Sequence, residues 1–131
     1  MEAGVRFAHL VGMSRDFRKL HVFQLADELL LRVYRISSFP REERFSLQAQ
    51  VRRAALSASA NIVEGSARRT TREFLNFINI AAGSATETRY LLDVSGRLGY
   101  IPMKDATDLV SRYSKLAARL QALLVSLASE P

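Results

Sequence analysis

The sequence predicts an all-α protein, folded as an up-down-up-down antiparallel four-helix bundle. Apolar residues recur at helical spacing in four successive segments, and the breaks between these segments are short. Helices joined by short connections lie antiparallel beside one another. The composition agrees, because only 8% of residues are aromatic and there are three prolines and no tryptophan. β-Sandwiches, by contrast, are rich in aromatic and turn residues.

One domain is expected. The chain has 131 residues, 48% of them hydrophobic, which suffices for a single core and is too little for two ordinary domains. We expect the bundle to span residues 14–131. We expect residues 1–13 to be a disordered leader or an upstream start, since Met13 reads as an alternative start.

The first helix is expected over residues 19–37. It ends at "SSFP", because Pro40 disfavours helical backbone in the residue before it. The second helix is expected to start with Glu42 and Glu43 in its first turn, where acids interact favourably with the helix dipole. Gly65 is expected to end it as a left-handed cap. Its apolar line consists of Leu47, Val51, Ala54, Ala58 and Ile62.

The third helix is marked by a capping box. Thr70 to Glu73 reads T-x-x-E before an apolar residue, so the helix should begin at Thr70 or Thr71 and stop at Gly99. Small residues form the runs "AALSASAN" in the second helix and "AAGSA" in the third. Because short side chains let helices approach closely, these two helices should cross tightly there. Asn61 is expected to satisfy backbone groups at the corner between them.

The fourth helix is expected to open at Pro102. Its apolar positions repeat at intervals of four and three, which is typical of the seam of a left-handed bundle. These positions are Leu109, Tyr113, Leu116, Leu120, Leu123 and Leu127. A second apolar line consists of Ala106, Val110, Ala117 and Leu124. This line predicts either a wider core within one chain or contacts between subunits, and periodicity leaves both open.

The residue types needed for catalysis are absent or badly spaced. The lack of cysteine excludes disulfides, thiolate zinc sites and cysteine nucleophiles. The two histidines, His9 and His21, belong to no Glu-x-x-His pair, which excludes the di-iron site of many four-helix bundles. The segment "EGSARR" lacks the glycine spacing and the lysine of a phosphate-binding P-loop. We therefore expect no enzymatic activity, no metal and no cofactor.

Membrane association is not expected either. No apolar run approaches the ~20 residues that a membrane span requires. The N-terminus also lacks a basic start followed by a long apolar stretch, the pattern of a signal peptide. We expect a cytoplasmic protein.

The chain is basic, with 19 Lys and Arg against 13 Asp and Glu and a formal net charge of +6. The excess is concentrated in residues 41–72, which carry seven bases and three acids. Guanidinium groups match phosphate geometry, and a helix N-terminus offers free N–H groups to an anion. The predicted nucleic-acid-binding residues are Arg52, Arg53, Arg68, Arg69 and Arg72. An equally good interpretation is a solvated basic corner paired with Glu64 and Glu73.

Three blocks of the sequence carry a family resemblance. They are "L-x-V-F-Q-L-A", "FP-x-E-x-R-F-S-L-x-x-Q-x-R-R-A-A-x-S-x-x-x-N-I-x-E-G-S-x-R" and "F-x-x-F-x-x-I-A-x-G-S-x-x-E". Over roughly residues 17–128 the chain resembles the four-helix bundle family of 23S ribosomal RNA intervening-sequence proteins. Related bundles serve as accessory variability determinants of diversity-generating retroelements. The resemblance implies homopentamers with a basic surface and, in the retroelement branch, binding to nucleic acid and to a reverse transcriptase.

Two functions therefore follow as expectations. The first is a non-catalytic, homo-oligomeric bundle, a pentamer, that binds RNA or DNA through phosphate contacts made by a basic surface. The alternative is a protein-interaction scaffold that docks a partner such as a reverse transcriptase and has no intrinsic affinity for nucleic acid.

Overall fold

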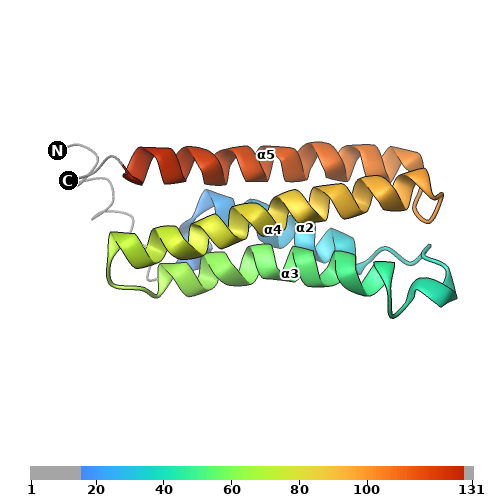
Figure 1. The fold of residues 1–131 in the computed structure, drawn as a ribbon, viewed down its shortest axis with the longest axis horizontal. Coiled ribbons are helices and arrows are strands. Elements are labelled where there is room, and N and C mark those ends of the chain that lie inside the picture. The colour runs from blue at the N-terminus through green and yellow to red at the C-terminus, as the bar shows by residue number, and fades with distance from the viewer. Residues whose placement is uncertain (1–15, 129–131) are drawn as a thin grey trace.

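The computed structural model describes residues 16–128, and within them the chain forms four α-helices and two short 3-10 turns (Figure 1). The helices are α2 (His21–Tyr34), α3 (Leu47–Ser66), α4 (Thr71–Arg97) and α5 (Met103–Ala128), and the turns are η1 (Phe17–Lys19) and η2 (Arg41–Glu43). Consecutive helices run antiparallel, so the predicted all-α, up-down-up-down four-helix bundle is confirmed. The expected leader, residues 1–13, lies outside the described residues.

The core is built from one apolar stripe of each helix. Its largest fully buried side chains include Leu29, Val33, Val51, Ile62, Ile78, Leu92, Leu109, Tyr113, Leu116 and Leu120. The second apolar line of α5 faces the same core, because Ala106 is buried and Val110, Ala117 and Leu124 pack against the buried cluster. Within one chain, a wider core therefore accounts for this line.

Helices α3 and α4 cross closely through small residues, as predicted. Ala55, Ala58, Ala81 and Ala85 are completely buried. The hydroxyl groups of Ser57 and Ser84 lie 2.8 Å apart and form a hydrogen bond between the two helices. Asn61, predicted to serve the corner, instead donates to the carbonyl of Ser57 one turn earlier in α3, at 2.8 Å. The short serine and alanine side chains bring the backbones of α3 and α4 close enough for the hydrogen bond between Ser57 and Ser84.

Gly65 does not cap α3 in the way the sequence predicted. It lies inside α3, which continues to Ser66, and its φ is not positive. A Cβ atom at Gly65 would lie only 2.9 Å from the Cβ of Phe77 on α4. Glycine is therefore required here by the close approach of a second helix, and its conformational freedom is not used.

The start of α3 also differs from the prediction. The helix begins at Leu47, and Glu42 and Glu43 lie in the preceding η2 turn. Glu43 nevertheless serves α3, because its carboxylate accepts hydrogen bonds from the Leu47 amide at 3.2 Å and the Ser46 hydroxyl at 2.8 Å. The acid thus satisfies an amide that has no partner within the helix.

Both ends of α4 are as predicted. The hydroxyl of Thr70 accepts a hydrogen bond from the Glu73 amide at 3.2 Å and donates one to the Glu73 carboxylate at 2.9 Å. At the other end, Gly99 adopts a φ of 76°, and the amide of Tyr100 donates to the carbonyl of Ser95 at 2.9 Å. This 6→1 hydrogen bond is typical of a Schellman motif, which ends the helix.

Two connections meet at one end of the bundle. The hydroxyl of Ser38, between α2 and α3, donates to the carbonyl of Tyr100, between α4 and α5, at 2.9 Å. The rings of Phe39 and Tyr100 lie 6.4 Å apart between centroids. Segments 62 residues apart in sequence therefore close this end, on the right in Figure 1.

Candidate nucleic-acid interface

The five predicted arginines do not form one cluster. Arg52 and Arg53 lie in the first half of α3, whereas Arg68, Arg69 and Arg72 lie around the turn between α3 and α4. Arg52 and Arg68 are sixteen positions apart, which corresponds to about 24 Å at the rise of an α-helix. We call the second group the α3–α4 corner.

Arg52 is used to hold α2 against α3. Its Nη2 donates to the carbonyl of Tyr34, the last residue of α2, at 3.0 Å, and its guanidinium lies 4.9 Å from the centre of the Tyr34 ring. This bond satisfies a carbonyl at the helix end, where partners within the helix run out. Arg53 is exposed and donates to Gln50 at 3.1 Å. Of this pair, only Arg53 presents its charge to solvent.

Arg68 is likewise engaged in the fold. Its Nη2 lies 2.7 Å from a carboxylate oxygen of Glu64, the pair expected from their i, i+4 spacing. Its guanidinium also lies 4.7 Å from the centre of the Phe77 ring on α4, a cation–π contact. Arg68 therefore ties the end of α3 to α4.

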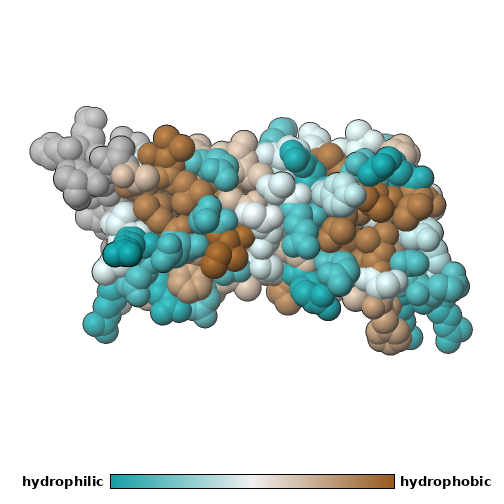
Figure 2. Space-filling model, in the orientation of Figure 1, coloured by the Kyte–Doolittle hydropathy of each residue, from teal (hydrophilic) through white to brown (hydrophobic). Residues whose placement is uncertain are grey.

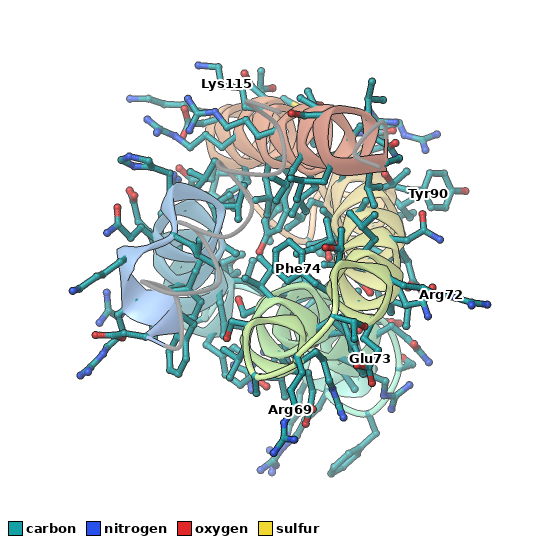
Figure 3. All side chains as sticks on the ribbon, turned by 90° about the vertical axis from the view of Figure 1, so that its left-hand side faces the viewer. Arg69, Arg72, Glu73, Phe74, Tyr90 and Lys115 are labelled. Atoms are coloured by element: carbon teal, nitrogen blue, oxygen red, sulfur yellow. The ribbon has the colours of Figure 1, made fainter. Side chains whose placement is uncertain are left out.

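Arg69 and Arg72 are the available cations of the α3–α4 corner. Both are exposed, and neither pairs with an acid among residues 16–128. Figure 3 shows both side chains extending away from the bundle, in different directions. Glu73 stands beside them in the first turn of α4, held by Thr70. The corner thus offers an anion two arginines rather than three, with a carboxylate close by.

A second basic surface, not predicted from the sequence, lies where α2 meets α5. On α5, positions 104, 108, 112, 115 and 119 follow one another at spacings of four and three, so they share one face. Asp108 on this face pairs with Arg32 of α2, which places the face beside α2. We call this surface the α2–α5 edge; its basic residues are Arg32, Arg35, Lys104, Arg112, Lys115 and Arg119. The spacing rule that reveals apolar seams could have identified it.

Charges along the α2–α5 edge are only partly paired. Asp108 accepts hydrogen bonds from Arg32 at 2.8 Å and from Arg112 at 3.0 Å, and these bonds hold the pKa of Asp108 below its usual value. The other four cations, Arg35, Lys104, Lys115 and Arg119, are exposed and have no acidic partner in the described part of the chain. Viewed end-on, Lys115 projects on the side of the bundle opposite Arg69 (Figure 3).

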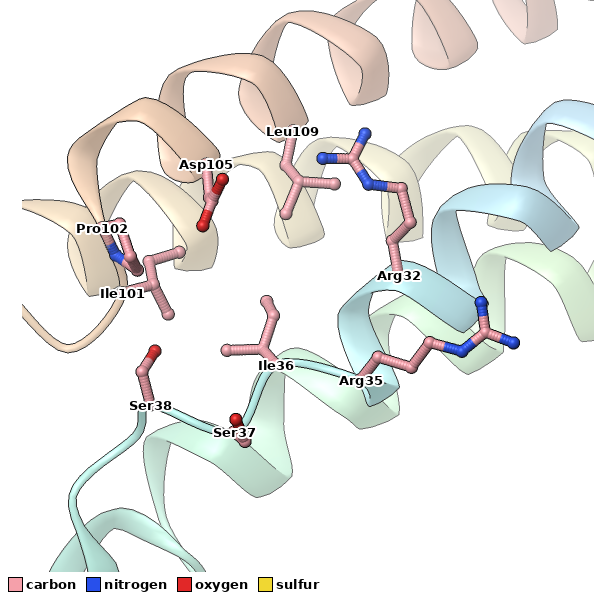
Figure 4. A pocket seen from close by; sticks show the side chains of 9 residues that line it. All are labelled: Arg32, Arg35, Ile36, Ser37, Ser38, Ile101, Pro102, Asp105 and Leu109. Atoms are coloured by element: carbon pink, nitrogen blue, oxygen red, sulfur yellow. The ribbon is translucent and has the colours of Figure 1, made fainter.

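A cavity of about 440 Å³ lies at the end of the bundle where α2 finishes and α5 begins (Figure 4). We call it the end pocket. It is lined by Arg32, Arg35, Ile36, Ser37, Ser38, Ile101, Pro102, Asp105 and Leu109. The carboxylate of Asp105 points into the space, whereas the guanidinium of Arg35 points away from it. With no histidine and no carboxylate pair in its lining, the end pocket holds no evident acid–base couple.

Other chemical features are few. Residues 16–128 contain no group of three or more His, Asp or Glu side chains that could hold a metal ion. The hydroxyl of Tyr113 is buried without a hydrogen-bond partner, and burial raises its pKa. Among the helices that the structure describes, none is long and apolar enough to cross a membrane.

Several large apolar side chains are exposed. Phe45 is the most exposed of these, at 87%. The others are Leu31, Tyr34, Leu56, Ile80, Tyr90, Leu98, Met103 and Val125. Figure 2 shows apolar side chains gathered in separate patches toward both ends of the face that α4 crosses, with more polar residues between them. Patches of this kind mark interaction sites when they are large enough.

Known proteins share this fold and sequence pattern. The model of the 23S rRNA-intervening sequence protein family matches residues 18–122. A crystal structure from Bacteroides thetaiotaomicron, described as a protein with unknown function from the S23 ribosomal protein family, aligns with a TM-score of 0.72 at 26% sequence identity. The alignment covers 79% of this chain and 97% of that chain. No curated protein matches the sequence.

Proposed function

The chain belongs to the 23S rRNA-intervening sequence protein family, and we propose that it is a non-catalytic homo-oligomer that binds RNA or DNA through phosphate contacts. The proposed assembly is a pentamer. Its basic surfaces supply the phosphate contacts. Because such contacts carry no sequence information, nucleic acids of unrelated sequence should bind with similar affinity.

The observation that carries this proposal is a set of exposed cations without acidic partners among the described residues. Two lie at the α3–α4 corner and four along the α2–α5 edge. An arginine already paired with a carboxylate must give up that pair to bind a phosphate, whereas an unpaired one does not. Neutralising phosphates releases condensed counterions, which drives binding at low salt.

Self-assembly strengthens such binding. The unpaired cations of one subunit are divided between separate surfaces, so each surface of a single copy has a modest footprint on nucleic acid. Several copies held together make the second and later contacts intramolecular, which raises the overall affinity without any new type of contact. The exposed apolar side chains, above all Phe45, support contacts between subunits.

The test is a binding titration with RNA and DNA of unrelated sequence, in single-stranded and duplex form, between about 50 and 200 mM salt. We expect the logarithm of the association constant to fall linearly with the logarithm of salt concentration, with similar slopes for all sequences. Light scattering should give a mass near five times 14.7 kDa. Binding that is absent at low salt, or indifferent to salt, would exclude the phosphate-contact proposal.

The second candidate function is a scaffold that docks a protein partner such as a reverse transcriptase. It is favoured by the exposure of Tyr90 on α4 and Leu56 on α3, two apolar side chains that lie outside the core. A pure scaffold shows no salt-dependent affinity for nucleic acid. The titration above therefore separates the two functions.

A further inference from the structure

The turn between η2 and α3 displays an aromatic side chain that the fold does not bury. Phe45 is 87% exposed, although this turn is well braced. Glu43 accepts hydrogen bonds from the Ser46 hydroxyl and the Leu47 amide, and the Arg44 amide donates to the carbonyl of Arg41 at 3.2 Å. The ring is therefore held outward by an ordered turn, at a position where it adds nothing to the core of its own subunit.

Charged side chains surround this ring. The guanidinium of Arg44 lies 5.4 Å from the centre of the Phe45 ring, so the cation and the ring form one unit. Glu42 is exposed two positions earlier and pairs with no cation in the described part of the chain. The turn thus presents an apolar ring with Arg44 against it and an unpaired acid, Glu42, three positions before it in the sequence.

The end pocket has the complementary character. Ile36, Ile101 and Leu109 supply apolar walls, and the space of about 440 Å³ is within the range of cavities that hold whole small molecules, so it can accept one phenyl ring. Asp105 points its carboxylate into this space, and Arg35 stands at its rim (Figure 4). Neither residue has an oppositely charged partner among residues 16–128.

Ring and pocket lie at the same end of the bundle. The turn that carries Phe45 leads into α3, while the pocket is formed by the end of α2 and the start of α5, and Figure 1 shows all three at one end. The high exposure of Phe45 shows that it does not fill the pocket of its own subunit. Each copy of the chain therefore has an unfilled pocket and an exposed phenyl ring at the same end.

We infer that Phe45 of one subunit docks into the end pocket of the next copy of this chain, with Arg44 facing Asp105 and Glu42 facing Arg35 across the interface. This inference rests on the proposed self-assembly and identifies its interface. The two surfaces in contact are different, so the interaction is heterologous, and repeating it by a closing rotation generates a ring.

Removing the ring tests this directly. The variant Phe45→Ala should keep its helical circular dichroism, because the side chain is exposed within its own subunit, and should fall from the mass of the assembly to 14.7 kDa by light scattering. Tyr90→Ala, which removes another exposed aromatic on the outer face of α4, serves as the matched control and should keep the full mass. A Phe45→Ala protein that keeps the wild-type mass overturns the inference.

Cross-linking locates the contact, since the chain has no cysteine of its own. Arg44→Cys and Asp105→Cys chains, which both keep the Phe45 ring, are made separately, co-assembled and treated with a bis-maleimide cross-linker, and they should form a linked pair containing one chain of each kind. Neither chain alone should form a linked pair. Absence of the mixed pair in an assembly of full mass overturns the docking inference and leaves the assembly itself standing. A monomeric wild-type protein would overturn both the docking inference and the proposed assembly.

Exchanging the charges of Arg44 and Asp105 tests the proposed interface independently. Arg44→Asp should weaken assembly, and adding Asp105→Arg to the same chain should restore it, because the pair of opposite charges is then reversed rather than lost. Failure of the double variant to recover mass speaks against the proposed register. If Phe45→Ala keeps its mass but loses affinity for single-stranded nucleic acid, the ring stacks on bases instead, and the docking inference is wrong.

Discussion

The α3–α4 corner and the α2–α5 edge are both rich in cations, but the fold uses those cations differently. At the corner, Arg68 stacks on Phe77 and pairs with Glu64, so it belongs to the bundle. At the edge, one carboxylate, that of Asp108, is shared by two arginines, and the remaining cations have no acidic partner among residues 16–128. The density of basic residues in the sequence therefore points to the corner, whereas the density of unpaired charge points to the edge.

The difference shows that a count of arginines does not measure what a ligand can reach. A guanidinium that stacks on a ring and bonds a carboxylate has little left to offer a phosphate without cost to the fold. Cations repeated at helical spacing on one exposed face remain available together.

The largest effect is expected from neutralising the α2–α5 edge by replacing Lys104, Lys115 and Arg119 together with Ala. Each lost phosphate contact flattens the logarithmic salt slope by about 0.9, so three contacts change the salt sensitivity between 50 and 200 mM by roughly 40-fold. Binding titrations at several salt concentrations measure this. The control removes the exposed ion pair of Arg97 and Asp93, which leaves the net charge unchanged. A triple variant with the wild-type slope would eliminate the edge as a contact surface.

A smaller effect is expected at the α3–α4 corner. Replacing Arg69 and Arg72 with Ala removes two contacts, which changes the same salt sensitivity by roughly 10-fold. Both side chains are exposed, so circular dichroism and thermal unfolding should be unchanged. Titration of this variant beside the edge variant ranks the two surfaces, and a larger loss at the corner would reverse the comparison.

Within the corner, Arg68 and Arg69 are expected to differ in stability rather than in binding. Arg68→Ala loses the contact with Phe77 and the pair with Glu64, which together contribute about 1 kcal/mol to the free energy of unfolding. Arg69→Ala, its neighbour and control, should change stability by less than about 0.5 kcal/mol. Urea unfolding measures both. Equal stabilities for the two variants would show that neither the Phe77 contact nor the pair with Glu64 contributes to the free energy of unfolding.

The smallest effect concerns the pH dependence that Asp108 confers. Its bonds to Arg32 and Arg112 lower its pKa in the folded protein, so its contribution to stability is present above the usual value of 3.8 and is lost as the pH falls below it. Asp108→Asn should therefore unfold at lower urea concentration than wild type at pH 7, and the gap should close in acid. Glu87→Gln, which changes an exposed acid of α4 without an ion-pair partner among residues 16–128, should show no such gap. A gap that persists at low pH would assign the effect to packing.

Local features of the fold could be predicted from the sequence because their causes are local. The capping box at Thr70 and the stop at Gly99 depend on residues within a few positions of each other. The apolar spacing gave the number and order of the helices for the same reason. By contrast, the role of Gly65 depends on Phe77 of another helix, and its sequence neighbours carry no trace of that contact.

The candidate site was harder to predict, because it depends on which charges meet in space. Arg52 looked available in the sequence, yet its acceptor is the carbonyl of Tyr34, eighteen residues earlier. The pairing of Arg32 with Asp108 joins residues 76 positions apart. Neither contact leaves a local pattern. The cations of α5 do leave a pattern, because Lys104, Arg112, Lys115 and Arg119 recur at intervals of eight, three and four on one face, but they are spread along the helix and do not cluster as the arginines of residues 41–72 do.

The contact between Ser38 and Tyr100 has a kinetic consequence. Its partners are 62 residues apart in sequence and meet only when the end of α2 packs beside the end of α4, so we expect it to form after the rate-limiting step of folding. Interactions that are absent from the transition state leave the folding rate unchanged and slow unfolding. The contact between Ser38 and Tyr100 therefore lengthens the lifetime of the folded chain. A Ser38→Ala protein should refold at the wild-type rate and unfold faster.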